Sequence, residues 1–177
     1  MERKFNQIKE EYNDLQRQML LKGQMPFKDT GIGFWGGSVL DEVFNAFKKI
    51  KLENFRNFID LGSGDGRVVL AASLFGVKAV GVEVDKELFN RSVDMQRKLE
   101  LPKALFYNDD FFEHAVSAYD IIFCNPDKPL SRGLEKKLIN EMNGKLILHG
   151  HHFHPKSLKK EDTFYLNETL FTIYGKE

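Results

Sequence analysis

The sequence is short of the residues and charge patterns on which several classes of protein depend. Cys124 is the single cysteine among 177 residues, which excludes an intrachain disulfide and a zinc site of four thiolates. Lysine plus arginine and aspartate plus glutamate both number 26, so there is no net charge to attract nucleic acid or an anionic membrane. No apolar run approaches the roughly 20 residues that span a bilayer, and the charged N-terminus lacks the apolar core of a secretory signal. We therefore expect a soluble, cytoplasmic protein without a membrane partner.

The first 37 residues differ in pattern from the rest of the chain. From Phe5 to Met19 the apolar residues recur at steps of three and four, which predicts one buried stripe on a helix that ends near Gly23. Residues 23–37 are rich in glycine and carry Phe34 and Trp35, so we expect a loop there. Such a helix can either cover the sheet or mediate dimerisation, and the oligomeric state stays open. We divide the chain into residues 1–37, a helix and an aromatic, glycine-rich loop, and a main domain, residues 38–177.

The main domain alternates short apolar runs with helical stretches, which is typical of βαβ units and a mostly parallel sheet. Ser38 is the expected N-cap of its first helix, at residues 39–49. The other expected helices are at residues 67–75, 86–99 and 131–142, and the expected strands at 57–61, 79–84, 104–107, 120–124 and 145–149. Residues 164–167 and 170–174, joined by Glu168 and Thr169, predict a terminal antiparallel hairpin. The expected fold class is therefore α/β.

The segment FIDLGSGDGR leads from a strand into a helix through Gly62, Gly64 and Gly66. Glycines at such a turn let the backbone approach a ligand closely. A dinucleotide-binding turn has the spacing G-x-G-x-x-G, but Arg67 stands where its third glycine would be. Asp60 at the head of the turn would repel a phosphate and suits a cation. The turn therefore favours a ligand with a cationic amino-acid end, such as S-adenosylmethionine.

Further acidic residues follow the next two strands. Glu83, about 20 residues after the first glycine, can accept hydrogen bonds from both hydroxyls of a ribose. Asp85 is the expected N-cap of the following helix. Asp110 can accept from an adenine amino group while the backbone N–H of Phe111 meets the ring edge, and Asp109 is the competing assignment for the same role. Carboxylates in this order at successive strand ends predict a site for an adenosine-containing cofactor.

Four segments, DLGSGDGR, VGVEVD, NDDFF and YDIIFCNPD, together resemble the successive motifs of class I S-adenosylmethionine-dependent methyltransferases over roughly residues 35–175. The resemblance implies a Rossmann-like fold: a seven-stranded, mostly parallel sheet with helices on both faces and a C-terminal antiparallel hairpin. It implies S-adenosylmethionine as cofactor, bound across the carboxyl ends of the strands. By matching positions it assigns Asp60, Gly62, Gly64 and Gly66 to the methionine end, Glu83 to the ribose and Asp110 to the adenine. Ser63, within the glycine turn, is a further expected cofactor contact.

The methyl acceptor is expected where the segment YDIIFCNPDKP leaves the fourth strand. The side-chain carbonyl of Asn125 and the backbone carbonyl before Pro126 can accept from an amino group and hold its lone pair toward the methyl group. This resembles the motif of amino-directed methyltransferases, in which Asn or Asp is followed by two prolines and an aromatic residue. Asp127 and Lys128 depart from that motif at its last two positions. Asn125 counts both as a catalytic candidate and as a cofactor contact.

The glycine turn and the aromatic loop ahead of the first helix of the main domain resemble the small lysine methyltransferases related to the Dot1 type and their archaeal relatives. The resemblance implies that the loop lies over the cofactor, with Phe34 and Trp35 near the reacting atoms. The alternative is that both residues form a hydrophobic plug over the edge of the sheet. We expect Trp35, Asn125, Pro126 and Asp127 to be catalytic, with Asp127 orienting the incoming ammonium group.

We therefore expect methyl transfer to an amino nitrogen such as that of a protein lysine. An RNA base or a small-molecule amine is an alternative acceptor, although the net charge does not support a nucleic-acid partner. A scaffold protein that binds the cofactor without catalysis is an alternative of another class, and a nicotinamide dehydrogenase is disfavoured by Arg67 and the terminal hairpin.

The segment HGHHFH places His149, His151, His152 and His154 after the fifth strand of the main domain. No carboxylate lies at a matching short spacing and Cys124 is distant in the sequence, so we expect no metal site. One of these histidines could act as a base beside the substrate cleft.

Overall fold

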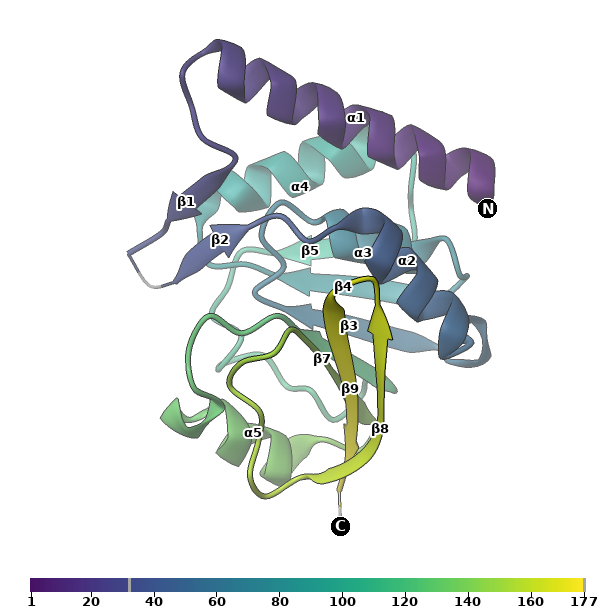
Figure 1. The fold of residues 1–177 in the computed structure, drawn as a ribbon, viewed down its shortest axis with the longest axis vertical. Coiled ribbons are helices and arrows are strands. Elements are labelled where there is room, and N and C mark those ends of the chain that lie inside the picture. The colour runs from purple at the N-terminus through teal and green to yellow at the C-terminus, as the bar shows by residue number, and fades with distance from the viewer. Residues whose placement is uncertain (32, 177) are drawn as a thin grey trace.

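The computed structural model describes residues 1–31 and 33–176, and its centre is a seven-stranded sheet (Figure 1). The strand order is β5-β4-β3-β6-β7-β9-β8, with β9 antiparallel to both of its neighbours and the other adjacent pairs parallel. The predicted α/β class and the C-terminal hairpin are therefore confirmed. The strands are β3 (Asn57–Leu61), β4 (Lys78–Val82), β5 (Ala104–Tyr107), β6 (Ile121–Cys124), β7 (Lys145–His149), β8 (Lys159–Leu166) and β9 (Thr169–Gly175).

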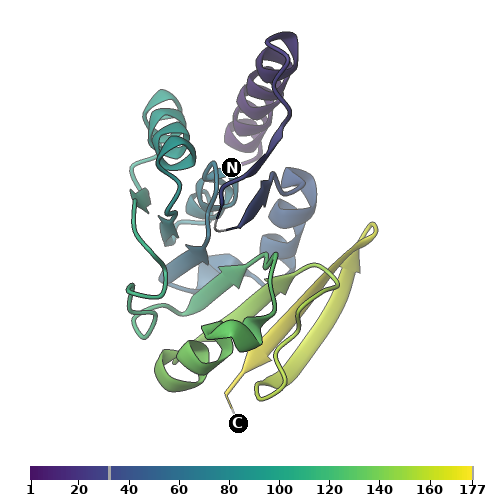
Figure 2. The same ribbon diagram turned by 90° about the vertical axis from the view of Figure 1, so that its left-hand side faces the viewer.

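Helices cover both faces of this sheet, as Figure 2 shows. One face carries α2 (Leu40–Lys49), α3 (Arg67–Ser73) and α4 (Lys86–Lys98), and the other carries α5 (Leu134–Glu141). Two separate apolar clusters correspond to the two faces, and the central strands contribute to both by alternation. Phe58 and Phe123 point into the first cluster, whereas Ile59 and Ile122 point into the second. The strands β3, β4, β6 and β7 are thus buried on both faces, which explains why they are nearly continuous apolar runs. The edge strand β8 is mostly exposed and correspondingly polar.

The strand order places a ligand crevice at the carboxyl end of β3. The chain leaves β3 for β4 on one side, and later returns to β6 on the other side. At such a switch point the two connections diverge and leave a gap beyond the strand ends. Residues that follow β3, β4 and β6 therefore meet at one edge.

The N-terminal helix α1 (Glu2–Leu21) packs on the outside of α2 and α3. Phe5 stacks on Phe44 with 3.8 Å between ring centroids, and Ile8 and Tyr12 are fully buried. The predicted apolar stripe is confirmed, and it covers other helices rather than the sheet. Among the described residues no helix is both long and apolar enough to cross a membrane.

The prediction of a loop over residues 23–37 is wrong at two short segments, which form β-strands. β1 (Phe27–Asp29) and β2 (Phe34–Gly36) pair antiparallel and form a hairpin beside the main sheet. The side chains of Asp29 and Thr30 close its turn by accepting from the backbone N–H groups of Gly31 and Gly33. Strands of three residues are too short to produce an apolar alternation, so the sequence pattern did not reveal them.

Three further expectations about element ends are corrected. The N-cap of α2 is Val39 rather than Ser38, and no side chain caps this helix. The expected helix at residues 131–142 is interrupted at Gly133, where a short 3₁₀ helix η2 (Leu130–Arg132) gives way to α5. The turn between β8 and β9 uses Asn167 and Glu168, because asparagine tolerates the left-handed backbone (φ 52°) that the turn requires. A second 3₁₀ helix, η1 (Leu52–Asn54), precedes β3.

Candidate functional site

A cavity of about 640 Å³ opens at the switch point, beyond the carboxyl ends of β3, β4 and β6. This volume falls within the range of roughly 300–1,000 Å³ typical of small-molecule sites. Of the predicted site residues, only Gly66 lies outside its wall; the lining includes Trp35, Asp60, Gly62, Ser63, Gly64, Glu83, Asp110, Phe111, Asn125, Pro126 and Asp127. Strand topology thus brings together residues that are scattered over more than 90 positions of the sequence.

The glycine turn is held against β4 by Glu83. One carboxylate oxygen of Glu83 accepts from the backbone N–H of Gly64 at 2.8 Å, and the other accepts from the N–H of Asp85 at 2.8 Å. Burial raises the pKa of Glu83, and these backbone N–H groups offset part of that shift. Glu83 therefore shapes the turn in addition to facing the cavity, a structural role that the sequence pattern did not suggest.

Asp60, at the end of β3, is the most deeply buried carboxyl group of the cavity wall apart from Asp65, with 3% of its surface exposed. Burial raises the pKa of Asp60 well above its usual range, and the neighbouring charges of Glu83 and Asp65 raise it further. Burial makes the ionised form of this carboxyl group unfavourable, and a cation placed next to it would stabilise that form. The wall is therefore complementary to a positively charged ligand group.

A buried cluster that the sequence pattern did not reveal anchors the glycine turn to α1. The guanidinium group of Arg67 binds the Asp65 carboxylate through two nitrogens, at 3.0 and 2.6 Å. Arg67 also lies over the ring of Tyr12 at 4.7 Å, and the Tyr12 hydroxyl donates to the carbonyl of Asp65 at 2.7 Å. Arg67 therefore neutralises the charge of Asp65 within the cavity wall. One feature of the sequence pointed to this cluster: Tyr12 stands at the centre of the predicted apolar stripe, and the hydroxyl of a buried tyrosine needs a hydrogen-bonding partner.

The β1–β2 hairpin forms the wall of the cavity opposite the strands. Trp35 is 9% exposed, and its indole lies so close to Gly64 that a Cβ at that position would come within 2.4 Å of it. Phe34 also lines the cavity, is 57% exposed and stacks on Phe27 at 5.7 Å. Trp35 thus covers the glycine turn, and any side chain at residue 64 would displace it.

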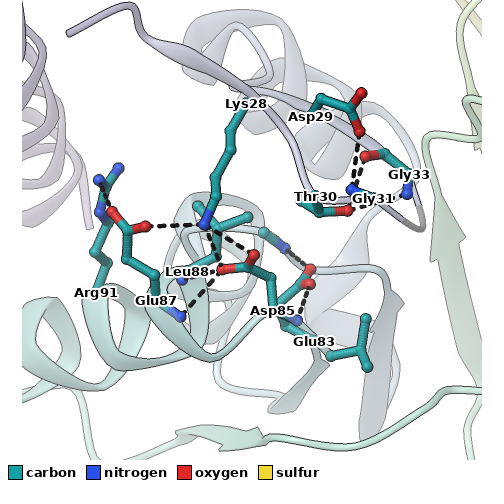
Figure 3. A network of polar contacts seen from close by, with 12 residues as sticks. Lys28, Asp29, Thr30, Gly31, Gly33, Glu83, Asp85, Glu87, Leu88 and Arg91 are labelled. Carbon is teal, nitrogen blue, oxygen red and sulfur yellow. Dashed lines mark hydrogen bonds and ion pairs between the residues drawn. The ribbon is translucent and has the colours of Figure 1, made fainter.

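Lys28 ties the hairpin to the start of α4, as Figure 3 shows. Its ammonium group lies 2.9 Å from Asp85 and 2.8 Å from Glu87, and Glu87 also pairs with Arg91. Asp85 at the same time accepts from the backbone N–H groups of Glu87 and Leu88. The predicted N-cap role of Asp85 is therefore confirmed, and the residue has a second role as the anchor of Lys28.

The segment after β6 forms the end of the cavity at which the acceptor is expected. Asn125 and Pro126 line it, and one carboxylate oxygen of Asp127 accepts from the backbone N–H of Phe34 at 2.6 Å. Burial raises the pKa of the Cys124 thiol beyond its usual range, so this cysteine is not an activated nucleophile.

Asp110 and Phe111 lie at the cavity, whereas Asp109 is absent from its lining. The Asp109 side chain accepts from the backbone N–H of Asp110, and Asp110 accepts from that of Phe112. This geometry favours Asp110 over Asp109 as a partner for an adenine ring.

The four histidines make separate contacts, and in the described part of the chain they form no group that could hold a metal ion. His154 contacts the Tyr174 hydroxyl at 2.7 Å, and His151 lies 2.9 Å from the carbonyl of Glu168. His149 lies between the rings of Phe123 and Phe171, with both ring nitrogens buried and without a hydrogen-bonding partner in the described part of the chain. None of the four lines the cavity, so none is placed to act as a base there.

His149 should make the protein less stable in mild acid. Burial lowers the pKa of His149 from 6.5 to about 4. Between these two values the imidazole is protonated in the unfolded chain but neutral in the folded protein, so the folded state loses stability as the pH falls below 6.5. We expect the free energy of unfolding to drop by about 2 kcal/mol from this group between pH 7.5 and pH 5. Urea unfolding of His149→Phe should lack this loss, whereas the exposed control His152→Phe should retain it. Equal losses in both variants would contradict the assignment to His149.

Comparison with known proteins supports the fold and indicates the family. A human lysine N-methyltransferase whose name gives an ATP synthase component as its target is 37% identical over 105 residues, which are 57% of this chain and 43% of the human protein. The chain therefore matches less than half the length of that relative. Among solved structures, an RNA methyltransferase from Salinibacter ruber in complex with S-adenosyl-L-homocysteine superposes with a TM-score of 0.65 and 22% identity, over 75% of this chain and 88% of that one.

A second structure, the tRNA (uracil-54, C5)-methyltransferase of Pyrococcus abyssi, gives a TM-score of 0.64 at 14% identity and covers 80% of this chain and 45% of that one. At such identities these two structures support the Rossmann-like fold alone. The family comparison goes further, because residues 60–162 match the ANTKMT methyltransferase domain. This segment begins at Asp60, contains the glycine turn, Glu83 and Asn125, and makes up more than half of the chain. The predicted resemblance to class I methyltransferases is confirmed, since the chain belongs to the ANTKMT methyltransferase domain family.

Proposed function

We propose that the protein transfers a methyl group from S-adenosylmethionine to the side-chain amino group of a protein lysine. The family membership and the human lysine N-methyltransferase to which it is similar support this reaction. The observation that carries the proposal is that one cavity combines two features. Its acidic end has the buried carboxyl groups of Asp60 and Glu83, and its other end has the Asn125-Pro126 segment beneath the β1–β2 hairpin, which we call the aromatic hairpin because it carries Phe34 and Trp35.

The residues at the acidic end fit the proposed cofactor. Asp60 would face the cationic amino-acid end, the carboxylate of Glu83 would accept from the ribose hydroxyls, and Asp110 with the N–H of Phe111 would meet the adenine. S-Adenosylmethionine supplies, when bound, an electrophilic methyl group on a positively charged sulfur. A raised pKa is expected for a buried carboxyl group whose cationic partner is the ligand and is therefore missing in the free protein.

The other end of the cavity suits an amino acceptor. An Asn side-chain carbonyl and the backbone carbonyl of Asn125 can both accept from a neutral amine and so direct its lone pair. A lysine side chain costs about 5 kcal/mol to deprotonate at pH 7, and desolvation against Phe34 and Trp35 lowers its pKa and reduces that cost. Positioning of the amine against the methyl group then supplies most of the rate enhancement.

The proposal is tested by incubating the protein with S-adenosylmethionine labelled in the methyl group. The acceptors offered are cell-extract proteins, total RNA and free lysine, and labelled protein sites are mapped by mass spectrometry. We expect label on lysine side chains, and peptides in which arginine replaces each mapped lysine should receive none. Label in RNA or in a small amine alone would contradict the lysine assignment. Cofactor binding without transfer to any acceptor would instead favour a scaffold protein.

A further inference from the structure

The β1–β2 hairpin is attached to the rest of the protein at two points on opposite sides of the cavity. At its β1 side, Lys28 pairs with Asp85 and Glu87 at the start of α4. At its β2 side, the backbone N–H of Phe34 donates to Asp127 at 2.6 Å. The first attachment links the hairpin to the segment that follows Glu83, and the second links it to the segment that follows Asn125.

The contact with Asp127 depends on a close approach of its side chain to the backbone of Gly33 and Phe34. A Cβ at Gly33 would lie 3.0 Å from the Asp127 carboxylate oxygen, so glycine leaves the room that the carboxylate occupies. The two partners, Phe34 and Asp127, are 93 residues apart in the sequence. A proline at position 127, as in the motif of amino-directed methyltransferases, could not accept this hydrogen bond.

The position of the hairpin determines the shape of the acceptor end. Phe34 and Trp35 line the same cavity as Asn125, and Trp35 packs directly on Gly64 of the glycine turn. If the β2 side moved outward, the aromatic wall would separate from Asn125 and water would enter beside the reacting atoms. Small displacements of a positioning group cost as much as roughly 100-fold in rate.

We propose that Asp127 is a positioning residue of the methyl-transfer reaction: its hydrogen bond to Phe34 holds the aromatic hairpin closed against the Asn125-Pro126 segment. This inference rests on the proposed lysine methyltransferase activity. It differs from the expectation that Asp127 orients the incoming ammonium group, because the oxygen that lies toward the hairpin is already engaged by a backbone N–H. Direct recognition of an ammonium group needs the charge of Asp127, whereas the hydrogen bond to Phe34 needs only an acceptor oxygen.

Two substitutions separate these roles. Asp127→Ala removes the acceptor, and we expect kcat on the lysine substrate to fall by about 10- to 100-fold, with the Kd for S-adenosylhomocysteine changed by less than about threefold because the Lys28 attachment remains. Asp127→Asn retains a carbonyl oxygen without the charge, so kcat should return to within about fivefold of the wild type. Glu113→Gln, an exposed acidic residue, is the matched control.

Closure of the hairpin can be measured without a substrate. Trp35 is the only tryptophan of the protein and lies buried on the hairpin, so quenching of its fluorescence by acrylamide reports opening. Quenching should roughly double in Asp127→Ala, because local opening exposes the indole, and should stay at the wild-type value in Asp127→Asn and Glu113→Gln.

The outcomes distinguish this inference from the function on which it rests. Greater quenching in Asp127→Ala with recovery in Asp127→Asn supports hairpin closure, even if no lysine is methylated and the proposed function fails. Unchanged quenching in Asp127→Ala overturns the inference. Equal loss of kcat in the Ala and Asn variants also overturns it, since the charge of Asp127 would then act on the acceptor.

Discussion

Replacing Gly66 by alanine should lower the free energy of unfolding by about 2–5 kcal/mol, of which roughly 1–2 kcal/mol reflects the left-handed backbone and about 1–3 kcal/mol the crowding. Gly66 has φ +82°, and an added Cβ would lie 2.5 Å from Cβ of Ser92 and 2.7 Å from the ring of Phe106. Ser92 is fully buried on α4 and Phe106 lies in β5, so the new methyl group meets packed side chains on two elements. The measurement is a urea unfolding curve, with circular dichroism as the readout of the folded fraction.

Gly62 provides a control that separates backbone strain from crowding. Its φ is +80°, but no atom lies within 4 Å of an added Cβ among the residues that the structure describes. Gly62→Ala should therefore lose only the backbone contribution, about 1–2 kcal/mol. Equal losses at the two positions would mean that Ser92 and Phe106 accommodate the methyl group. A larger loss of stability in Gly66→Ala than in Gly62→Ala would assign Gly66 to packing, in agreement with its position outside the cavity wall.

Asp60→Asn should weaken binding of S-adenosylmethionine at pH 8 by about 1–3 kcal/mol, because a charge-assisted contact with the cationic end is lost. In the wild type the affinity should rise with pH. Burial raises the pKa of Asp60 in the free protein, a bound cation lowers it, and binding between the two values therefore releases a proton. Titration calorimetry in buffers of different ionisation enthalpy measures that release. The variant should show a flatter pH profile.

Asp109→Asn is the matched control for this experiment, since Asp109 is exposed and does not line the cavity. Its affinity and proton release should equal those of the wild type. Asp60→Asn with unchanged affinity and an unchanged pH profile would remove Asp60 from the cofactor site.

The raised pKa of Asp60 should also make the stability of the ligand-free protein depend on pH. Because the pKa of Asp60 is higher in the folded state than in the unfolded chain, the folded state binds more protons above pH 3.8. The contribution of Asp60 to stability is therefore fully present below that pH and is lost as the pH rises through the raised pKa. This trend is opposite in sign to that of His149, so the two single variants distinguish the two groups.

The local pattern of the sequence determined the main sheet, the helices and the glycine turn. β3, β5 and β7 occur at the predicted residues because each is a compact apolar run between polar boundaries. Asp85 caps α4 as predicted, because an N-cap contact involves only the next two or three residues. The order of the acidic residues along the chain was enough to place them at one edge, because parallel strands align their carboxyl ends.

Only the tertiary structure decided which of these groups are paired and which face the cavity. Asp127 accepts from a backbone N–H 93 residues away, and Tyr12 donates to a backbone carbonyl 53 residues away. A backbone donor or acceptor leaves no side-chain pattern in the sequence, so neither contact could be predicted. Asp65 and Arg67 are near neighbours in sequence, but their burial depends on how α1 packs over the turn. Local sequence sets the elements because helix and strand periodicity are local properties, whereas pairing and burial depend on the packing of segments that are far apart in the chain.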